Sequence, residues 1–325
     1  MKKKIINILK SNDDFISGQM LSDQFGITRA AIWKYITQLK KEGYEIESIS
    51  RKGYRLISSP DLISSEEITP LLETKVFGKN IIHYDSIHST NSQAKLLCDE
   101  GLQEGSVILS EEQTSGRGRL GRNWSSPKGS SISMSVVLKP EINPVHVAKV
   151  TQISAAALSL AFEEMDIQCN IKWPNDIIIN NKKVCGILTE MSSELNKINY
   201  VVMGIGINVN IDEEAFPDEI KSIATSLKIE YGKQISRKQI IASFLKYFEN
   251  LYFEFINTGS AESSFEICRK RSLLLGKNIY VIRGSERTPA TAVSIDENGE
   301  LIVKYEDGTL SNLVSGEVSV RKSNV

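Results

Sequence analysis

The chain has 325 residues, of which 41% are hydrophobic and 24% charged, and its formal net charge is −1. This composition is typical of a folded globular protein and excludes disordered and fibrous classes, and the length predicts two or three domains. The N-terminal segment has neither a long apolar core nor a small-residue cleavage site, and no apolar run approaches the roughly 20 residues of a membrane span, so we expect a cytoplasmic protein without a membrane partner.

The N-terminal residues form a basic head. Residues 1–60 contain 11 Lys and Arg against 6 Asp and Glu, whereas the remaining residues contain 28 against 34. A basic segment on an acidic body is expected where one end of a chain meets a polyanion. Two helices are predicted in this head: one over 16–26 that ends at Gly26, and one that begins after Thr28, a plausible N-cap, and ends at Gly43.

A hairpin follows the second helix. Residues 44–57 alternate between apolar and polar types and break at Arg51-Lys52-Gly53, so the predicted turn carries two positive charges. Helix, glycine turn, helix and basic hairpin in this order predict a winged helix-turn-helix that binds DNA, although lysines on an exposed helix often only keep a surface solvated. The DNA contacts that we expect are Arg29, Lys34, Thr37, Arg51 and Lys52.

The body of the chain mixes helices and strands. A serine-rich linker is predicted over 58–67, before strands over 80–87, 106–112, 131–138, 170–179, 184–192 and 198–207 and helices near 91–100, 144–165 and 236–257. This order favours an α+β domain with a mixed sheet over a regularly wound parallel sheet. From Gly276 onward, short strands between polar turns predict a small β-barrel, so we expect domains over 1–60, 61–274 and 275–325.

Two loops of the body carry unusual polar residues. Residues 115–124, SGRGRLGRNW, contain three arginines and three glycines within seven positions. Because glycine destabilises the interior of helices and strands, we predict a loop here, with arginines that can hold a phosphate or a carboxylate. Ser89, Thr90 and Asn91 stand where a strand meets a helix, so their hydroxyls and the free N–H groups could bind an anion or only cap the helix.

Two further segments have features of a ligand site. Lys183 stands beside a predicted Asn-Asn turn, after a KWPND segment in which Pro174 holds Trp173 extended. Gly204 and Gly206 fall inside a predicted strand, where glycine often marks the close approach of a ligand or another backbone. Each such segment alone is more often structural, but four of them in one domain predict a site for a small anionic ligand.

Metal and disulfide chemistry is not expected. The four cysteines are widely spaced, only three histidines occur, and the sequence has no Cys-x-x-Cys motif and no Cys/His cluster. We therefore expect buried or incidental cysteines and no protein-bound metal.

Five motifs resemble those of the bifunctional biotin–protein ligases and biotin operon repressors of bacteria, and the resemblance covers nearly the whole chain. They are STN at 89–91, EQTSGRGRLGRNW at 112–124, KWPND at 172–176, KVCGILTE at 183–190 and GIGINVN at 204–210. The pairing of GRGR with KWPND at this separation is specific, and the N-terminal helix-turn-helix implies the repressor form. The resemblance implies a central domain of the biotin/lipoate ligase type and a C-terminal SH3-like β-barrel.

The resemblance also implies a reaction. A biotin–[acetyl-CoA-carboxylase] ligase makes biotinyl-5′-AMP and pyrophosphate from biotin and ATP with Mg²⁺, and then transfers the biotinyl group to a lysine of a carrier protein. The implied partners are a biotin carrier domain of acetyl-CoA carboxylase or of another biotin enzyme, operator DNA, and a second copy of the chain when the adenylate is bound as corepressor.

The expected site residues follow from the resemblance, position by position. Biotin is expected to contact Ser89, Thr90, Asn91, Gln113, Arg117, Gly118, Arg119 and Lys183, of which Arg117 and Gly118 belong to a loop that closes over it. The nucleotide is expected to contact Arg119, Arg122, Trp124 and Asn208. The expected catalytic residues are Arg119 and Lys183, which meet the carboxylate and phosphates, and Asp176, which orients or deprotonates the acceptor lysine. Leu120 departs from the best-known member of the family, which has arginine there.

Three other interpretations remain open at this stage. The chain could be a ligase whose N-terminal domain does not bind DNA, or a ligand-sensing repressor without catalysis, although Lys183 and the arginines of the loop are intact. A lipoate–protein ligase shares the catalytic fold, and only the pairing of GRGR with KWPND favours biotin. In the C-terminal barrel, Arg321 is a candidate contact to the nucleotide or the carrier.

Overall fold

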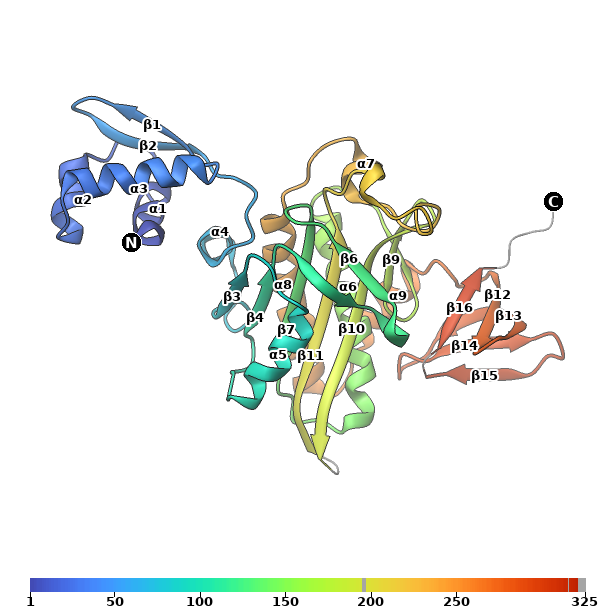
Figure 1. The fold of residues 1–325 in the computed structure, drawn as a ribbon. Coiled ribbons are helices and arrows are strands. Elements are labelled where there is room, and N and C mark those ends of the chain that lie inside the picture. The colour runs from blue at the N-terminus through green and yellow to red at the C-terminus, as the bar shows by residue number, and fades with distance from the viewer. Residues whose placement is uncertain (195–196, 315, 321–325) are drawn as a thin grey trace. The chain divides into compact units, whose positions relative to one another are not determined.

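The computed structural model describes residues 1–194, 197–314 and 316–320. By its internal contacts the chain divides into two compact units, Met1–Leu62 and Ile63–Val325 (Figure 1).

The first unit is a three-helix domain with a β-hairpin. Its elements are α1 (Lys2–Lys10), α2 (Gly18–Phe25), α3 (Arg29–Lys41), β1 (Glu45–Ile49) and β2 (Gly53–Ser58). The predicted helix-turn-helix and wing are confirmed: the Thr28 hydroxyl accepts a hydrogen bond from the backbone N–H of Ala31, and Gly26 ends α2 at φ +63°. Helix α1 was not predicted, because its run of lysines hides the spacing of Ile5, Ile6 and Leu9, which are buried against α3 and the hairpin.

The second unit is built on a seven-stranded mixed sheet. Its strand order is β3-β4-β7-β11-β10-β9-β8, and only β3 and β4 pair in parallel among the described strands. The strands are β3 (Ile81–Tyr84), β4 (Val107–Ser110), β7 (Ser131–Leu138), β8 (Asn170–Lys172), β9 (Asp176–Ile179), β10 (Lys182–Glu194) and β11 (Lys197–Asn208). The predicted α+β class is confirmed. The single strand expected over 170–179 is instead split at Trp173-Pro174-Asn175, because proline has no N–H for a ladder.

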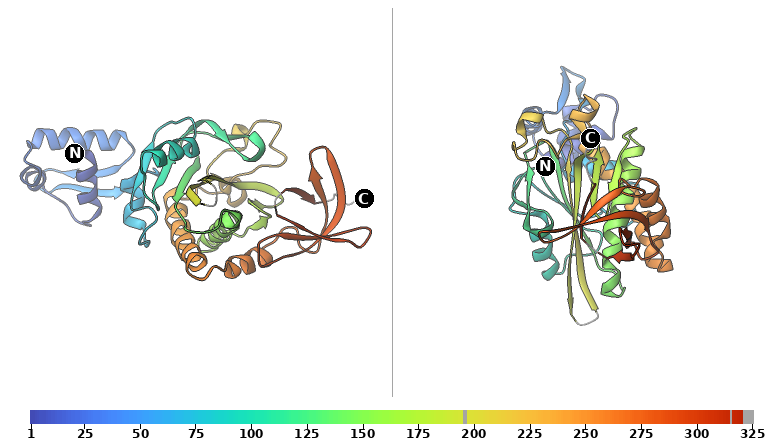
Figure 2. Two further views of the ribbon diagram at one scale, coloured as in Figure 1. Left: turned by 90° about the horizontal axis from the view of Figure 1, so that it is seen from below. Right: turned by 90° about the vertical axis from the view of Figure 1, so that its right-hand side faces the viewer.

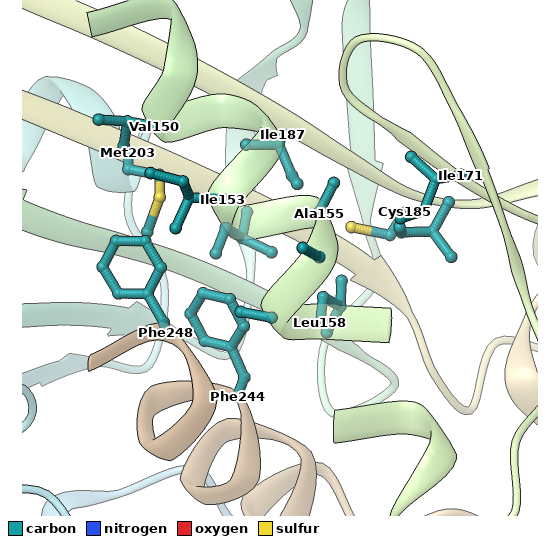
Figure 3. Close-up of a cluster of buried hydrophobic side chains, with 14 of the residues drawn as sticks. Val150, Ile153, Ala155, Leu158, Ile171, Cys185, Ile187, Met203, Phe244 and Phe248 are labelled. Atoms are coloured by element: carbon teal, nitrogen blue, oxygen red, sulfur yellow. The ribbon is translucent and has the colours of Figure 1, made fainter. Parts of the chain in front are cut away.

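Helices cover the two faces of this sheet unequally. On one face lie α6 (Val147–Glu163), α8 (Arg237–Thr258) and α9 (Glu262–Lys270), and on the other lie α5 (Thr90–Asp99) and a short hairpin (Figure 2). Helix α6 is apolar nearly all round and is enclosed between the sheet and α8, where Phe244 and Phe248 approach Ile153 and Met203 (Figure 3). The remaining short helices are α4 (Ser65–Ile68), η1 (Thr69–Leu71), η3 (Pro144–His146), η4 (Glu213–Ala215) and α7 (Leu227–Tyr231).

Two expectations about segments of the body are wrong. No apolar run near 20 residues was expected, but Pro144–Glu163 is long and apolar enough to cross a membrane by length and composition. In the structure it is a core helix, and 72% of its most apolar window is buried. The polar residues Lys149 and Gln152 interrupt this run in the sequence, so it does not stand out as apolar. In the fold both are buried, with less than 8% of each exposed. The linker predicted over 58–67 is also shorter than expected, since α4 already begins at Ser65.

The arginine-rich segment is a hairpin, and the prediction that it contains no strand is wrong. Strand β5 (Gln113–Arg117) pairs with β6 (Asn123–Ser126) around the short helix η2 (Arg119–Gly121). Gly116 pairs with Trp124, and a Cβ atom at Gly116 would lie 2.4 Å from the Trp124 carbonyl oxygen. Glycine is therefore required by the close approach of the two strands and does not exclude them. Leu120 stands at the tip, 75% exposed, with φ +56°.

The C-terminal residues form a five-stranded antiparallel sheet, as the short predicted strands indicated. Its strands are β12 (Asn278–Arg283), β13 (Glu286–Ile295), β14 (Leu301–Tyr305), β15 (Leu310–Leu313) and β16 (Glu317–Val320), in the order β15-β14-β13-β12-β16. The apolar core of the body continues into this sheet through Ile279, Val281 and Val303. The indole N–H of Trp173 donates to the carbonyl oxygen of Gly299, at 2.9 Å. Arg321 lies outside the described residues.

A buried ion pair connects the start of the second unit to its sheet. Arg237, the first residue of α8, and Glu111, just after β4, are 1% and 4% exposed, and their Nη1 and Oε2 atoms are 2.6 Å apart. The other oxygen of Glu111 accepts the backbone N–H of Ile63. Burial by itself raises the pKa of Glu111, but the approach of His83 Nε2, 3.7 Å from Oε1, the hydrogen bond and charge of Arg237 and the N–H of Ile63 bring it down to about 2.

Replacing Arg237 with leucine is expected to destabilise the second unit by about 3–5 kcal/mol at pH 7, because it leaves a buried carboxylate without its cation. Since the pKa of Glu111 is depressed in the folded state, the contribution of the pair is complete above the ordinary carboxyl pKa and is lost as the pH falls toward 2. Urea unfolding of both proteins at pH 7 and pH 3 measures the difference, which should shrink at the lower pH because pH 3 lies below the ordinary carboxyl pKa.

Lys246→Leu is the control, since the partner of Lys246, Glu164, has a side chain that is 40% exposed, and surface pairs contribute less than about 1 kcal/mol. An Arg237→Leu protein as stable as this control would contradict the assignment.

Candidate functional site

One cavity of about 830 Å³ opens in the second unit, within the size range of small-molecule sites. It is lined by the start of α5, the β5–β6 hairpin, strands β9, β10 and β11, the segment 211–224 and the C-terminal sheet. All the ligand-site residues expected in the body lie in its lining: Ser89, Thr90, Asn91, Gln113, Arg117, Gly118, Arg119, Arg122, Trp124, Asp176, Lys183 and Asn208. Segments more than two hundred residues apart in sequence, from Ser89 to Ser319, therefore meet at one place.

One end of the cavity is a cluster of neutral polar groups at the start of α5. Ser89 caps this helix, and the backbone N–H and hydroxyl of Thr90 both donate to Gln113 Oε1, at 2.9 and 3.2 Å. The hydroxyl of Ser135 lies 2.6 Å from Asn91 Oδ1, and Asn91 Nδ2 donates to Glu190 Oε2 at 2.8 Å. These side chains fix one another, so the cluster presents donors and acceptors in set positions.

Two glycines of β11 make room for this cluster. A Cβ atom at Gly204 would lie 2.3 Å from Asn91 Oδ1, and one at Gly206 would lie 2.4 Å from the ring of Trp124. The close approach predicted for these glycines is present, and the approaching groups are the side chains of Asn91 and Trp124. No larger residue fits at either position without moving them.

The cavity as a whole is positively charged. Its described lining contains six cations and a single carboxylate, Asp176; the cations are Arg117, Arg119, Arg122, Lys172, Lys183 and Arg287. Lys183 Nζ lies 2.6 Å from Asp176 Oδ1, and Arg119 donates to Asn175, the residue before Asp176, so Lys183 and Arg119 form a cationic end of the cavity. Because six positive groups face one negative group, the cavity favours an anionic ligand.

Arg119 is held by contacts that the sequence does not reveal. Its guanidinium donates to the side-chain oxygen of Asn175 at 2.9 Å and to the carbonyl oxygen of Gly316 at 3.3 Å. Asn175 is buried, and its own amide donates to the carbonyl oxygen of Ile187. Asn175 belongs to the KWPND motif, and this motif is the only sequence signal for its role.

The apolar part of the lining was missed. Residues of the segment after β11, among them Phe216 and Ile220, line the cavity, and Ile223 is 61% exposed. Asn208, expected to contact a nucleotide, anchors this segment by donating to the carbonyl oxygen of Thr225 at 3.0 Å. The apolar residues here follow neither helical nor strand periodicity, so no pattern marked them.

In the first unit, four of the five expected DNA contacts are exposed. They are Arg29 and Lys34 on α3 and Arg51 and Lys52 at the hairpin turn. Thr37 is half-buried, and its hydroxyl donates to the carbonyl oxygen of Trp33 at 2.9 Å, which commits its proton to the helix. Trp33, not singled out as a contact from the sequence, is 63% exposed on the same helix.

Three family models match the chain. The helix-turn-helix model, described as HTH domain, matches residues 2–55, the model of the biotin/lipoate A/B protein ligase family matches 84–208, and the model of the biotin protein ligase C-terminal domain matches 274–321. Most of the cavity lining thus lies in segments matched by the second and third of these models, and the segment 211–224 and Leu273 lie between them.

Relatives and solved structures agree with these matches. The chain is 38% identical over 98% of its length to the bifunctional ligase/repressor BirA of Bacillus subtilis, covering 98% of that protein, and 26% identical over 98% to that of Escherichia coli, covering 97%. A biotin protein ligase from Aquifex aeolicus, solved in complex with biotin and ATP, is similar over 75% of this chain and 100% of its own, with 32% identity and a TM-score of 0.64. With the same domain models along its length and this identity to a full-length relative, the chain belongs to the family of bifunctional biotin–protein ligases and repressors.

Proposed function

We propose that this chain attaches biotin to a lysine of a biotin carrier protein in two ATP-dependent steps, and that its first unit represses biotin genes when biotinyl-5′-AMP is bound. The observation that supports this best is the cavity, which joins a neutral polar cluster to a cationic end. Biotin has this same division, with an uncharged ureido ring at one end and a carboxylate at the other. The domains that we propose are 1–60 for DNA, 61–274 for catalysis and 275–325 as a small barrel.

The neutral cluster is proposed to hold the ureido ring. Ser89, Thr90, Asn91 and Gln113 supply hydroxyl and amide groups there, and the buried ones are already fixed by bonds to one another. A site prepared in this way loses little entropy when the ligand binds. Arg117 and Gly118 stand on the hairpin beside this cluster and are proposed to close over the ring.

The cationic end is proposed to catalyse adenylation. In that step a carboxylate oxygen of biotin forms a bond to the α-phosphorus of ATP, and pyrophosphate leaves with the electrons of the broken P–O bond. Two anions must meet, so their repulsion has to be offset. Lys183 and Arg119 both line this end and supply positive charge, while Arg122, Trp124 and Asn208 are proposed to contact the nucleotide.

Magnesium is proposed to arrive with ATP. Asp176 is the only carboxylate among the described residues of the cavity lining, and no group of three metal-ligating side chains occurs in the described part of the chain. These residues do not form a resident metal site, whereas Mg²⁺ is commonly bound through one or two carboxylates together with substrate phosphates.

The second step transfers the biotinyl group. The acceptor lysine of the carrier forms a C–N bond to the acyl carbon while the bond to AMP breaks, so the amine must lose a proton. Asp176, 19% exposed and paired with Lys183, is proposed to orient or deprotonate that amine. The carrier is proposed to be the biotin domain of acetyl-CoA carboxylase or of another biotin enzyme.

The first unit is proposed to bind operator DNA as half of a homodimer, in the cytoplasm. Exposed basic residues on α3 and at the hairpin turn suit a helix in the major groove with a wing on phosphates. A dimer that forms when the adenylate is bound would match a palindromic site.

ATP–pyrophosphate exchange tests the adenylation step most directly. The purified chain is assayed with Mg²⁺ and ATP, with biotin, with lipoate or with neither acid. We expect exchange that requires biotin; exchange only with lipoate would overturn the substrate, and no exchange with either acid would leave a ligand-sensing repressor.

Lys183→Ala is expected to lower the rate of this exchange about 10²–10³-fold, because one charge that stabilises the transition state is lost. Lys182→Ala is the matched control, since Lys182 is the adjacent lysine on β10 and is not part of the described cavity lining. Equal rates for the two variants would remove Lys183 from the catalytic residues.

Two neighbouring glycines of the hairpin should respond differently to alanine. At Gly116 the new methyl group meets the Trp124 carbonyl oxygen at 2.4 Å, so the hairpin cannot close and exchange should fall about 10²-fold. At Gly118 the nearest atom is 3.6 Å away, so the hairpin forms and exchange is kept. The stiffer loop should still release biotinyl-5′-AMP faster, as a chase of bound labelled adenylate would show. Similar behaviour of both variants would argue against a loop that closes.

Lys34→Ala is expected to weaken operator binding and leave biotin ligation unchanged, because Lys34 is exposed on α3 in a separate unit. The DNA used is a set of duplexes that the protein selects from a random pool in the presence of biotin and ATP. The affinity for these duplexes should fall steeply as salt rises, and the variant should reduce the slope of log affinity against log salt concentration by about one. Lys304→Ala, on the C-terminal sheet, is the control. Loss of ligation together with DNA binding, or binding insensitive to salt, would contradict the two-unit picture.

A further inference from the structure

Glu190 lies behind the neutral cluster and makes two hydrogen bonds to α5. It stands on β10, outside the described lining of the cavity, with a side chain that is 35% exposed. Its Oε1 accepts from Lys95 Nζ at 2.7 Å, and its Oε2 accepts from Asn91 Nδ2 at 2.8 Å. Lys95 and Asn91 are four residues apart on α5, so one carboxylate spans one turn of that helix.

Glu190 is held in its ionised form. Burial raises its pKa, but hydrogen bonds from Lys95 and Asn91 and the charges of Lys95 and Arg117 bring the pKa below its ordinary value. An ionised carboxylate can only accept hydrogen bonds. Whichever group of Asn91 faces Glu190 must therefore be the donor, the Nδ2 amide, and the Oδ1 atom must face the other way.

The oxygen of Asn91 consequently lies on the side of β11 and the cavity. It is 2.6 Å from the hydroxyl of Ser135, and it occupies the space that a Cβ atom of Gly204 would need. An amide oxygen has two lone pairs, of which the Ser135 hydroxyl uses one. Because Asn91 lines the cavity, the second lone pair is available to a ligand that donates a hydrogen bond.

We propose that Glu190 is a positioning residue that makes Asn91 present an acceptor to the cavity, and that this selects ligands whose ring carries an N–H group. The inference rests on the proposed function and deepens it. The ureido ring of biotin has two N–H groups, whereas the dithiolane ring of lipoate has none. A ligand without the donor would leave the Asn91 oxygen desolvated and unpaired, so such a ligand would bind much more weakly.

Two replacements of nearly the same size separate this role from packing. Glu190→Met has no acceptor, which leaves Asn91 Nδ2 only its long contact to the carbonyl oxygen of Leu188, at 3.4 Å, so the amide can turn over. Glu190→Gln keeps one amide oxygen that can accept from Asn91 Nδ2, while the Lys95 side chain, 38% exposed, turns to solvent. Glu194→Met, four residues further along β10 and exposed, is the control. The KM and kcat of pyrophosphate exchange are measured with biotin and with biotins methylated on one or the other ring nitrogen.

In Glu190→Met we expect the KM for biotin to rise about 10–100-fold with kcat within about threefold, because a ground-state hydrogen bond is lost. One of the two methylated biotins lacks the ring N–H that donates to Asn91 Oδ1. The KM for that methylated biotin should hardly change, because it cannot make this hydrogen bond in either protein. The preference for biotin over that ligand should therefore collapse in Glu190→Met and persist in Glu190→Gln and Glu194→Met.

Two results would overturn the inference without touching the proposed function. One is an equal rise of KM for biotin and both methylated biotins, which a general distortion of α5 would cause. The other is an unchanged preference in Glu190→Met. Absence of biotin-dependent exchange in the unmodified protein would instead refute the proposed function itself.

Discussion

The site depends on the missing side chains of two glycines in the central strand of the sheet. Gly204 and Gly206, of which Gly206 pairs with Gly186 of β10, leave the surface of β11 open, and Asn91 and Trp124 fill that space. Asn91 comes from the first turn of α5, and Trp124 comes from the β5–β6 hairpin. The contacts to β11 therefore place two of the elements that line the cavity. A methyl group at either glycine would displace one of these elements.

The division of charge along the cavity follows from what each element can supply. The start of a helix offers backbone N–H groups and capping hydroxyls, which suit a neutral polar ring. The hairpin offers arginines. One of them, Arg119, is fixed by Asn175, which lies between β8 and β9. The same guanidinium reaches Gly316, so the C-terminal sheet helps to hold the cationic end. Buried polar side chains of α6 and Trp173, which bond to the turn before β14, hold that sheet against the body.

Periodicity and capping signals were sufficient for the elements that obey them. Thr28 and Gly26 mark the helix-turn-helix, and the helices near 91–100 and 236–257 lie within two residues of α5 and α8. The arginine hairpin was wrongly predicted as a loop because glycine alone favours an interruption of a strand. The close contact of Gly116 with Trp124, which requires glycine within this strand, is visible only in the folded structure. Asn175 and Glu190 act through partners 56 and 99 residues away, so no local pattern could reveal them. The motifs located the cavity, but its hydrogen bonds needed the fold.

Regulation of DNA binding by a ligand requires a physical connection between the cavity and the linker that carries the first unit. One such connection through the described residues runs along the end of β4. Ile63, where the second unit begins, donates its N–H to Glu111, and Gln113, two residues further on, accepts from Thr90 at the neutral cluster. The ion pair with Arg237 makes Glu111 a rigid point, since neither partner can move without leaving a buried charge unpaired. A ligand that repositions Gln113 would therefore act on a segment anchored at Glu111, the residue to which the start of the linker is also attached.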